Sequence, residues 1–408
     1  IWIEPADYGV IKYDPHTGIY KQYTQRRDFT SLSRHYQIVT DANGVLWVSM
    51  KGGGFGYYNP ATDDIDYFFD EPGSANQKFS NVVTSLFIDK TGVLWMSAKD
   101  GGINKVVSLT DKFDFRRIVD QPQNRSENDV RAMMRDTKAR LWICTKDGLV
   151  HVYDQGKEIR IFANSGNRIG YVYSILEDSK GNIWLGTKGN GLYKAVPTGA
   201  SHTLYRLQNY KNIRDDITSL SNNQVYSVIE DHKGRIWVGT FGGGLNLFTH
   251  FNGKDGFKNY ANGFHAYPFS WAKVVRDLCE DDHGRIWVAT SYGLLVFNAD
   301  GETNHAYKFH AYQKIPGNPH SLGNNGVQVV CKDKTGQIWV GTFGGGLNKV
   351  LVDHNDISHV SFKAFTMADG LPNDVVLSMT VDSQNNLWIA TAGGLSKFDP
   401  RCGVFKNY

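Results

Sequence analysis

Nine of the ten tryptophans in this 408-residue chain occupy one position of a repeated phrase. The phrase reads Asp-x-x-Gly-x-apolar-Trp-apolar-small-Thr, and a Gly-rich turn and an apolar pair follow it. Its two clearest copies, GRIWVGTFGGGLN at 234–246 and GQIWVGTFGGGLN at 336–348, differ at one letter. A recurring period constrains the architecture before any local pattern does, because each copy must form the same structural unit.

Successive repeat tryptophans are separated by 42 to 53 residues. They are Trp2, Trp47, Trp95, Trp142, Trp184, Trp237, Trp287, Trp339 and Trp388, whereas Trp271 falls outside the pattern. In the unit of Trp142, Ala139 stands where the other copies favour Gly. The period indicates one supersecondary unit that is repeated along the whole chain.

The unit around Trp237 contains four short segments with strand character. Residues 224–231 and 235–240 alternate and are rich in β-branched residues, 245–248 follow a Gly-rich turn, and 257–260 come after a variable stretch. No stretch of useful length has helical apolar spacing. Four strands per repeat predict an all-β fold, a β-propeller of four-stranded blades in which each Trp fills the space between neighbouring sheets.

The Gly-rich turn and the recurring Asp are interpreted as architecture. The turn lacks the Gly-x-Gly-x-x-Gly order and no helix follows it, so it does not resemble a phosphate-binding loop. The Asp is expected to bond local backbone N–H groups in a turn. We therefore expect no catalytic residues, no metal and no cofactor in these motifs.

Composition narrows the classes of function. The net charge of +3 argues against a nucleic-acid platform. No apolar run approaches 18 residues, so we expect membrane attachment only through a helix outside this segment. The four cysteines, Cys144, Cys279, Cys331 and Cys402, form no Cys-x-x-Cys pair, and their disulfide state stays open.

The full pattern resembles the two-component regulator propeller repeat. The resemblance rests on D-x-x-G-x-I-W-x-G-T-x-x-G-G-L and on lead-ins such as SLSNNQVYSVIED and GLPNDVVLSMTVD. It implies the periplasmic sensor domain of a Bacteroides-type hybrid two-component system, with histidine kinase and response regulator parts elsewhere. It also implies an oligosaccharide ligand released from a glycan, signal transduction to the cytoplasmic kinase, and a homodimer.

Nine repeats exceed the seven blades that the resemblance implies for one propeller. Counting back from the last repeat places a change of propeller near 105–125, where the sequence is irregular. We therefore predict that residues 1–115 close a first β-propeller and that 116–408 form blades of a second. The alternative is one large propeller of eight or nine blades over 1–408.

The first strand of each blade is expected to line the central channel. The residue five positions before each repeat Asp is mostly large and polar, beside uniformly apolar neighbours. Tyr rings stack on sugar faces, and Arg pairs with carboxylates or sulfates. This register gives the ligand-binding candidates Tyr36, Arg131, Tyr173, Tyr226, Arg276 and Gln328, beside Thr84 and Leu377. The alternative is a set of exposed strand ends.

One loop, residues 259–277, replaces the usual lead-in with aromatic residues. Its His265, Tyr267 and Trp271 are further ligand-binding candidates, because exposed aromatic side chains on a rigid scaffold often bind ligands. Phe269 is expected to pack against a neighbouring blade. Arg125, Arg168 and Lys273 would add positive charge on the same face.

Two other classes of function remain open at this stage. A propeller-fold hydrolase needs two converging carboxylates, and no channel position carries such a pair. A lyase that uses Tyr267 with His265 stays an alternative, as does a non-catalytic secretion or scaffold propeller. The sequence favours a sensor over an enzyme.

Overall fold

A computed structural model describes residues 1–4, 9–24, 37–41, 44–49, 54–69, 82–89, 93–98, 102–106, 117–119, 123–198, 204–301 and 307–408. The chain divides into two compact units, Ile1–Asp114 and Phe115–Tyr408. The assignment of these units to two separate propellers stays a prediction. No helix in the described ranges is long and apolar enough to cross a membrane.

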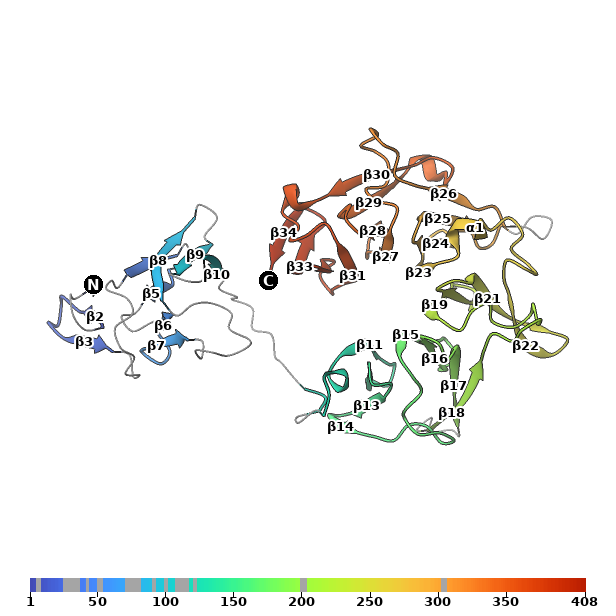
Figure 1. Ribbon diagram of the computed structural model, residues 1–408, viewed down its shortest axis with the longest axis horizontal. Helices are drawn as coiled ribbons and strands as arrows, with labels where there is room; N and C mark the ends of the chain where they lie inside the picture. The colour runs from blue at the N-terminus through green and yellow to red at the C-terminus, as the bar shows by residue number, and fades with distance from the viewer. Residues whose placement is uncertain are drawn as a thin grey trace. The chain divides into compact units, whose positions relative to one another are not determined.

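In its described residues the second unit contains six antiparallel four-stranded sheets, which we call blades A to F in chain order. Their first strands lie toward a common centre, and their fourth strands lie outermost (Figure 1). Each blade is a simple meander, because short turns join strands that are neighbours in the sequence. The predicted all-β propeller fold is confirmed.

Blades A to C hold the first twelve strands of this unit. Blade A contains β11 (Val130–Arg135), β12 (Leu141–Thr145), β13 (Val150–Asp154) and β14 (Lys157–Glu158). Blade B contains β15 (Val172–Glu177), β16 (Ile183–Thr187), β17 (Leu192–Thr198) and β18 (Leu204–Tyr210). Blade C contains β19 (Val225–Glu230), β20 (Ile236–Thr240), β21 (Gly244–Phe251) and β22 (Lys254–Lys258).

Blades D to F complete the unit. Blade D contains β23 (Val275–Glu280), β24 (Arg285–Thr290), β25 (Gly293–Asn298) and β26 (His310–Tyr312). Blade E contains β27 (Val327–Lys332), β28 (Ile338–Thr342), β29 (Leu347–Val352) and β30 (Val360–Phe365). Blade F contains β31 (Val376–Val381), β32 (Leu387–Thr391), β33 (Gly394–Asp399) and β34 (Val404–Asn407).

Short helical turns connect some of these strands. They are η1 (Arg125–Glu127), α1 (Phe269–Ala272), η2 (Asp353–Asn355) and η3 (Met367–Asp369). In blade C the third strand extends to Phe251, and a tight turn with Asn252 and Gly253 at positive φ leads directly into β22. The fourth strand therefore begins at Lys254, earlier than the predicted 257–260.

The first unit has three sheets in its described residues. The first contains β1 (Trp2–Ile3), β2 (Val10–Tyr13) and β3 (Tyr20–Tyr23). The second contains β4 (Gln37–Thr40), β5 (Leu46–Ser49), β6 (Phe55–Asn59) and β7 (Asp64–Phe68). The third contains β8 (Val83–Ile88), β9 (Leu94–Ala98) and β10 (Gly102–Val106).

The repeat Asp connects the turn to the Trp of the same blade. In blade C one carboxylate oxygen of Asp231 accepts hydrogen bonds from the backbone N–H groups of Lys233 and Arg235. The other oxygen accepts the indole N–H of Trp237 at 2.8 Å. Gly234 closes the turn at φ +74°, a backbone region that L side chains seldom adopt. Ala139, in the same place in blade A, adopts φ +63°.

The Trp side chains fill the interfaces between blades, as predicted. Trp142, Trp184, Trp237, Trp287 and Trp339 are at most 1% exposed. Trp237 lies in a cluster with Leu278, Ile286 and Phe297 of the next blade. Large aromatic groups contribute most of the buried apolar area at such an interface.

The Gly-rich turns of blades C and E bond to the segment that leads into the next blade. The N–H groups of Gly242 and Gly244 both donate to the carbonyl oxygen of Lys273, at 2.8 and 2.9 Å. Gly344 and Gly346 bind the carbonyl of Asp374 in the same way. Because these N–H groups already have an acceptor, the repeated phrase serves architecture.

A second link between blades lies at the other end of the first strands, where a glutamate accepts two bonds from the preceding blade's turn. Glu230 accepts the backbone N–H and the hydroxyl of Ser179, both at 2.6 Å. Glu177 binds Thr137, and Glu280 binds His232, in the same arrangement. These bonds therefore link each of these blades to the next one in the chain.

We expect Glu230→Ala to lower the free energy of unfolding by about 1–2 kcal/mol, because two charge-assisted hydrogen bonds are lost at a partly solvated site. Glu230→Gln keeps one acceptor oxygen and should lose less. Urea unfolding of both variants measures the difference. An unchanged stability of Glu230→Ala would show that this link does not hold blades B and C together.

Candidate functional site

Every first strand of blades A to F has a β-bulge near its start. The pairing with the second strand skips one residue, for example between Val225 and Ser227 in blade C. The skipped residues, which we call the bulge residues, are Arg131, Tyr173, Tyr226, Arg276, Gln328 and Leu377. A bulge takes a side chain out of the regular alternation and re-aims it. The predicted channel register thus coincides with the bulge position.

Blades B and C contribute three aromatic rings near these bulges, which we call the aromatic array (Tyr173, Tyr226 and Phe241). The rings of Tyr173 and Tyr226 stack with centroids 4.7 Å apart and an interplanar angle of 29°. Phe241, just after β20, lies 5.1 Å from Tyr226. The guanidinium carbon of Arg276 lies 5.7 Å from the Phe241 ring centroid, a cation–π arrangement. The array lies on blades B and C, and Arg276 of blade D adjoins it.

The polar groups of this array and the Nε of the adjoining Arg276 have no hydrogen-bond partner among the described residues. This holds for the hydroxyls of Tyr173 and Tyr226 and for the Nε of Arg276, whose atom is buried. Both Tyr rings are half-buried. Burial, followed by the neighbouring Tyr173, raises the pKa of Tyr226, so this hydroxyl remains a donor at neutral pH. Free donors beside half-buried rings suit a polar ligand with apolar faces.

The remaining candidates of the register do not join the array. Arg131 forms an ion pair with Asp129 at 2.9 Å. Gln328 is half-buried and Leu377 is exposed, and among the described residues neither side chain forms a hydrogen bond or ring contact with the aromatic array. Tyr36 lies outside the described residues.

The loop candidates do not form a common site. Tyr267 is 5% exposed in the core, and its hydroxyl donates to the carbonyl of Ala272 at 2.6 Å. Trp271, in α1, is half-buried against the same core cluster. The expectation that Tyr267 presents its ring to a ligand is therefore wrong, because the loop folds onto the next blade. His265 is exposed, and Phe269 stacks on Tyr260 at 3.7 Å.

One further position of the array was not predicted from the sequence. This position is the residue directly after the repeat Thr, at the end of the second strand. Its N–H donates to the carbonyl of the residue two before the bulge residue, as from Phe241 to Gln224 in blade C. The six residues are Lys146, Lys188, Phe241, Ser291, Phe343 and Ala392. Their variability directly after a uniform Thr is the signal that could have identified them.

An acidic group lies next to Arg276 but points elsewhere. One oxygen of Asp277 accepts from the Ser227 hydroxyl at 3.1 Å and the other accepts from the backbone N–H of Val330 at 3.1 Å. Burial raises the pKa of Asp277 to about 6. This carboxyl links blades C, D and E and does not neutralise Arg276.

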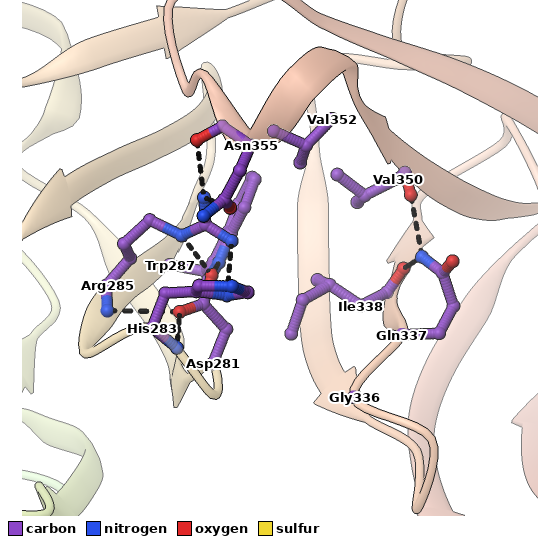
Figure 2. Close-up of a pocket in the computed structure, with 10 residues that line it drawn as sticks. All are labelled: Asp281, His283, Arg285, Trp287, Gly336, Gln337, Ile338, Val350, Val352 and Asn355. Carbon is purple, nitrogen blue, oxygen red and sulfur yellow. Dashed lines mark hydrogen bonds and ion pairs between the residues drawn. The ribbon is translucent and has the colours of Figure 1, made fainter.

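A separate notch of about 350 Å³ lies between blades D and E at the opposite end of β23 (Figure 2). Arg285 in this notch binds Asp281, and also Asn355 and His283. Gln337 donates to the carbonyl of Val350 at 2.6 Å. Since its main polar side chains already have protein partners, the notch offers a ligand fewer free hydrogen-bonding groups than the aromatic array does.

The four cysteines are free thiols. Cys144 is buried in the core, and burial raises the pKa of its thiol to about 12. Burial likewise raises the pKa of Cys331 to about 12. These thiols stay protonated and act as small core side chains.

A family model described as two component regulator propeller matches residues 168–189, 219–242, 271–292, 321–344 and 370–393. Each matched segment runs from the lead-in through the bulge and the repeat Trp to the Gly-rich turn. No curated protein matches the chain.

Several solved structures resemble the chain at low identity. The extracellular domain of a hybrid two component system from B. thetaiotaomicron is 18% identical, with 98% of this chain and 66% of that chain covered and a TM-score of 0.40. PorZ, a surface component of the type-IX secretion system of Porphyromonas gingivalis, is 17% identical (95% and 55% covered, TM-score 0.49). Virginiamycin B lyase from Staphylococcus aureus is 13% identical (69% and 84% covered, TM-score 0.49). The chain thus spans less than two-thirds of the first two proteins.

Proposed function

The chain carries two-component regulator propeller repeats, and from this premise we propose that it is the ligand-sensing ectodomain of a hybrid two-component system. The ligand is an oligosaccharide released from a glycan, and binding is signalled to a cytoplasmic histidine kinase. The ectodomain lies in the periplasm and acts as a homodimer.

The observation that carries the proposal is the aromatic array at the bulge positions. Its half-buried rings offer apolar surface for the C–H side of a sugar ring, and its free hydroxyls offer hydrogen bonds for sugar hydroxyls. Tyr173 and Tyr226, with the adjoining Arg276, also lie on first strands that contact the first strands of neighbouring blades. A ligand there contacts three blades at once and favours the arrangement of blades that binds it.

The site supports binding without turnover. The bulge residues include no acid, and the adjacent Asp277 is held by Ser227 and the N–H of Val330, so the array offers no pair of carboxylates for glycoside hydrolysis. The alternative of a lyase that uses Tyr267 with His265 loses its support. The Tyr267 hydroxyl already donates inside the core, and burial raises its pKa well above its usual range.

Calorimetric titration of the chain with a panel of defined neutral and acidic oligosaccharides, followed by chromatography of each mixture, tests the proposal. We expect saturable binding of at least one oligosaccharide and its recovery unchanged. New products would make the protein an enzyme, and the absence of heat across the panel would contradict the oligosaccharide sensor.

Tyr226→Ala should weaken the binding of such an oligosaccharide about fivefold to thirtyfold. Truncating a central aromatic contact costs roughly 1–2 kcal/mol, and 1.4 kcal/mol corresponds to a tenfold change. Tyr20→Ala, at a residue 67% exposed on β3, is the control and should bind as the parent does. Equal affinity of Tyr226→Ala and the parent would place the sugar elsewhere.

A further inference from the structure

We propose that the sugar bound at the aromatic array carries an anionic group, a carboxylate or a sulfate, and that Arg276 binds this group. The inference rests on the proposed function and deepens it. It starts from the guanidinium of Arg276, which is half-buried, lies over Phe241 and has a buried Nε without a partner.

Arg276 differs from the other buried or half-buried arginines of the blades. Arg140, Arg235 and Arg285 each donate through Nε to the repeat Asp of their own blade, at 2.5 to 2.6 Å. Arg276 forms no ion pair within the part of the chain that the structure describes. A guanidinium that is partly removed from water without a counter-ion is costly, and a bound anion would remove that cost.

The neighbouring carboxyl does not provide this counter-ion. Both oxygens of Asp277 accept bonds from other blades, from Ser227 on one side and from the N–H of Val330 on the other. The bulge leaves Arg276 without a cross-strand partner on β24, whereas Asp277 pairs with Ala289. Arg276 therefore faces the aromatic array while Asp277 serves the joint between blades.

Two lysines add positive charge beside the array. Lys188 bridges to Gln224, two residues before Tyr226. Lys273 precedes Val274, which bridges to Phe241. Both side chains are exposed, and neither forms an ion pair with a described carboxylate. Cations without acidic partners on adjoining segments attract an anionic ligand.

The geometry fits an acidic sugar better than a free anion. The guanidinium presents a planar fork that matches the oxygens of a carboxylate or a sulfate. The guanidinium lies over Phe241, Phe241 contacts Tyr226, and Tyr226 stacks on Tyr173. A sugar ring on the tyrosines thus reaches the guanidinium with a charged substituent, whereas a free anion would leave the rings unused.

The test compares four tetrasaccharides by calorimetry: oligogalacturonate, its methyl ester, a sulfated galactan fragment and its desulfated form. Each pair differs in charge and shares the sugar backbone, and the two charged members distinguish a carboxylate from a sulfate. We expect the affinity for a charged member to be at least about ten times that for its neutral partner. This affinity should fall as the salt concentration is raised.

Arg276→Gln should abolish this difference by weakening the charged member alone, and Arg276→Lys should keep part of it. Arg206→Gln, at an exposed arginine on the outermost strand β18, is the matched control and should change nothing. If neutral and charged members bind equally well and Arg276→Gln has no effect, the anionic ligand is overturned while the oligosaccharide sensor stands. If none of the four binds, both are overturned.

Discussion

Trp237→Ala is expected to lower the free energy of unfolding by about 3–5 kcal/mol, the range for removing a large, fully buried aromatic side chain. Trp237 is 0% exposed and packs against Phe264, Phe297 and Tyr307, with ring centroids 5.2 to 5.9 Å away. The substitution also removes the indole donor that Asp231 accepts. The loss combines the transfer of the indole, a cavity between blades C and D, and one hydrogen bond.

Trp388 provides the matched control for Trp237. It occupies the same repeat position in blade F and donates to Asp382 at 3.1 Å, but it is half-buried. We expect Trp388→Ala to cost about half as much, because the side chain gives up less buried area. Urea and thermal unfolding measure both variants. Equal losses, or a loss below about 1 kcal/mol for Trp237→Ala, would contradict the account of the blade interface.

Asp277→Asn is expected to stabilise the protein at neutral pH. The raised pKa of about 6 means that the folded state binds a proton more tightly than the unfolded state, in which the pKa lies near 3.8. The contribution of Asp277 to stability is therefore largest at low pH. This contribution falls as pH rises from about 4 to about 6. Above that range the ionised carboxylate lowers the free energy of unfolding by a constant amount.

The size of this effect follows from the shift of about two pKa units. At 1.36 kcal/mol per unit it reaches at most about 3 kcal/mol, and because the residue is half-buried we expect about 1–3 kcal/mol. An asparagine can still accept from Val330 and pair with Ser227. Asp277→Asn should therefore gain this amount at pH 7.5 and little at pH 4, as measured by urea unfolding across pH.

Asp216 is the control for this pH series. Hydrogen bonds from Thr218, its side chain first, lower the pKa of Asp216, so its contribution has the opposite sign and is lost on acidification. Asp216→Asn should thus slightly destabilise the protein at neutral pH. If the difference in unfolding free energy between Asp277→Asn and the parent is the same at every pH from 4 to 7, this carboxyl is not desolvated at the blade joint.

Much of the fold could be predicted from the sequence, because the blade repeats one local design. The Trp position, the turn Asp and the Gly-rich turn each depend on residues a few positions apart. The indole bond from Trp237 to Asp231 spans six residues and recurs in eight described repeats. Even the substitution at Ala139 keeps the positive φ of the turn.

Contacts between blades could not be predicted in the same way. The bond from Glu230 to Ser179 joins residues 51 positions apart, and no local pattern pairs them. The burial of Tyr267 also depends on the next blade, since its hydroxyl and ring are enclosed only after the loop packs down. Aromatic residues in a polar loop therefore suggested exposure that the tertiary structure removes.

The candidate site lies between these two cases. The sequence register located Tyr173, Tyr226 and Arg276, because a polar residue recurs among apolar neighbours. It did not reveal the bulge, which depends on strand pairing, or the contact of Tyr226 with Tyr173 across a blade boundary. Phe241 does not stand out in the sequence, because it directly precedes the glycines of the Gly-rich turn.

A crystal structure of the chain with the oligosaccharide that binds most tightly tests the central claim most directly. The account predicts a sugar ring in contact with Tyr173 and Tyr226, with a carboxylate or sulfate of the ligand on the guanidinium of Arg276. An oligosaccharide bound in the notch of Asp281 and Arg285, or on the outer strands, with the aromatic array left empty, would contradict it.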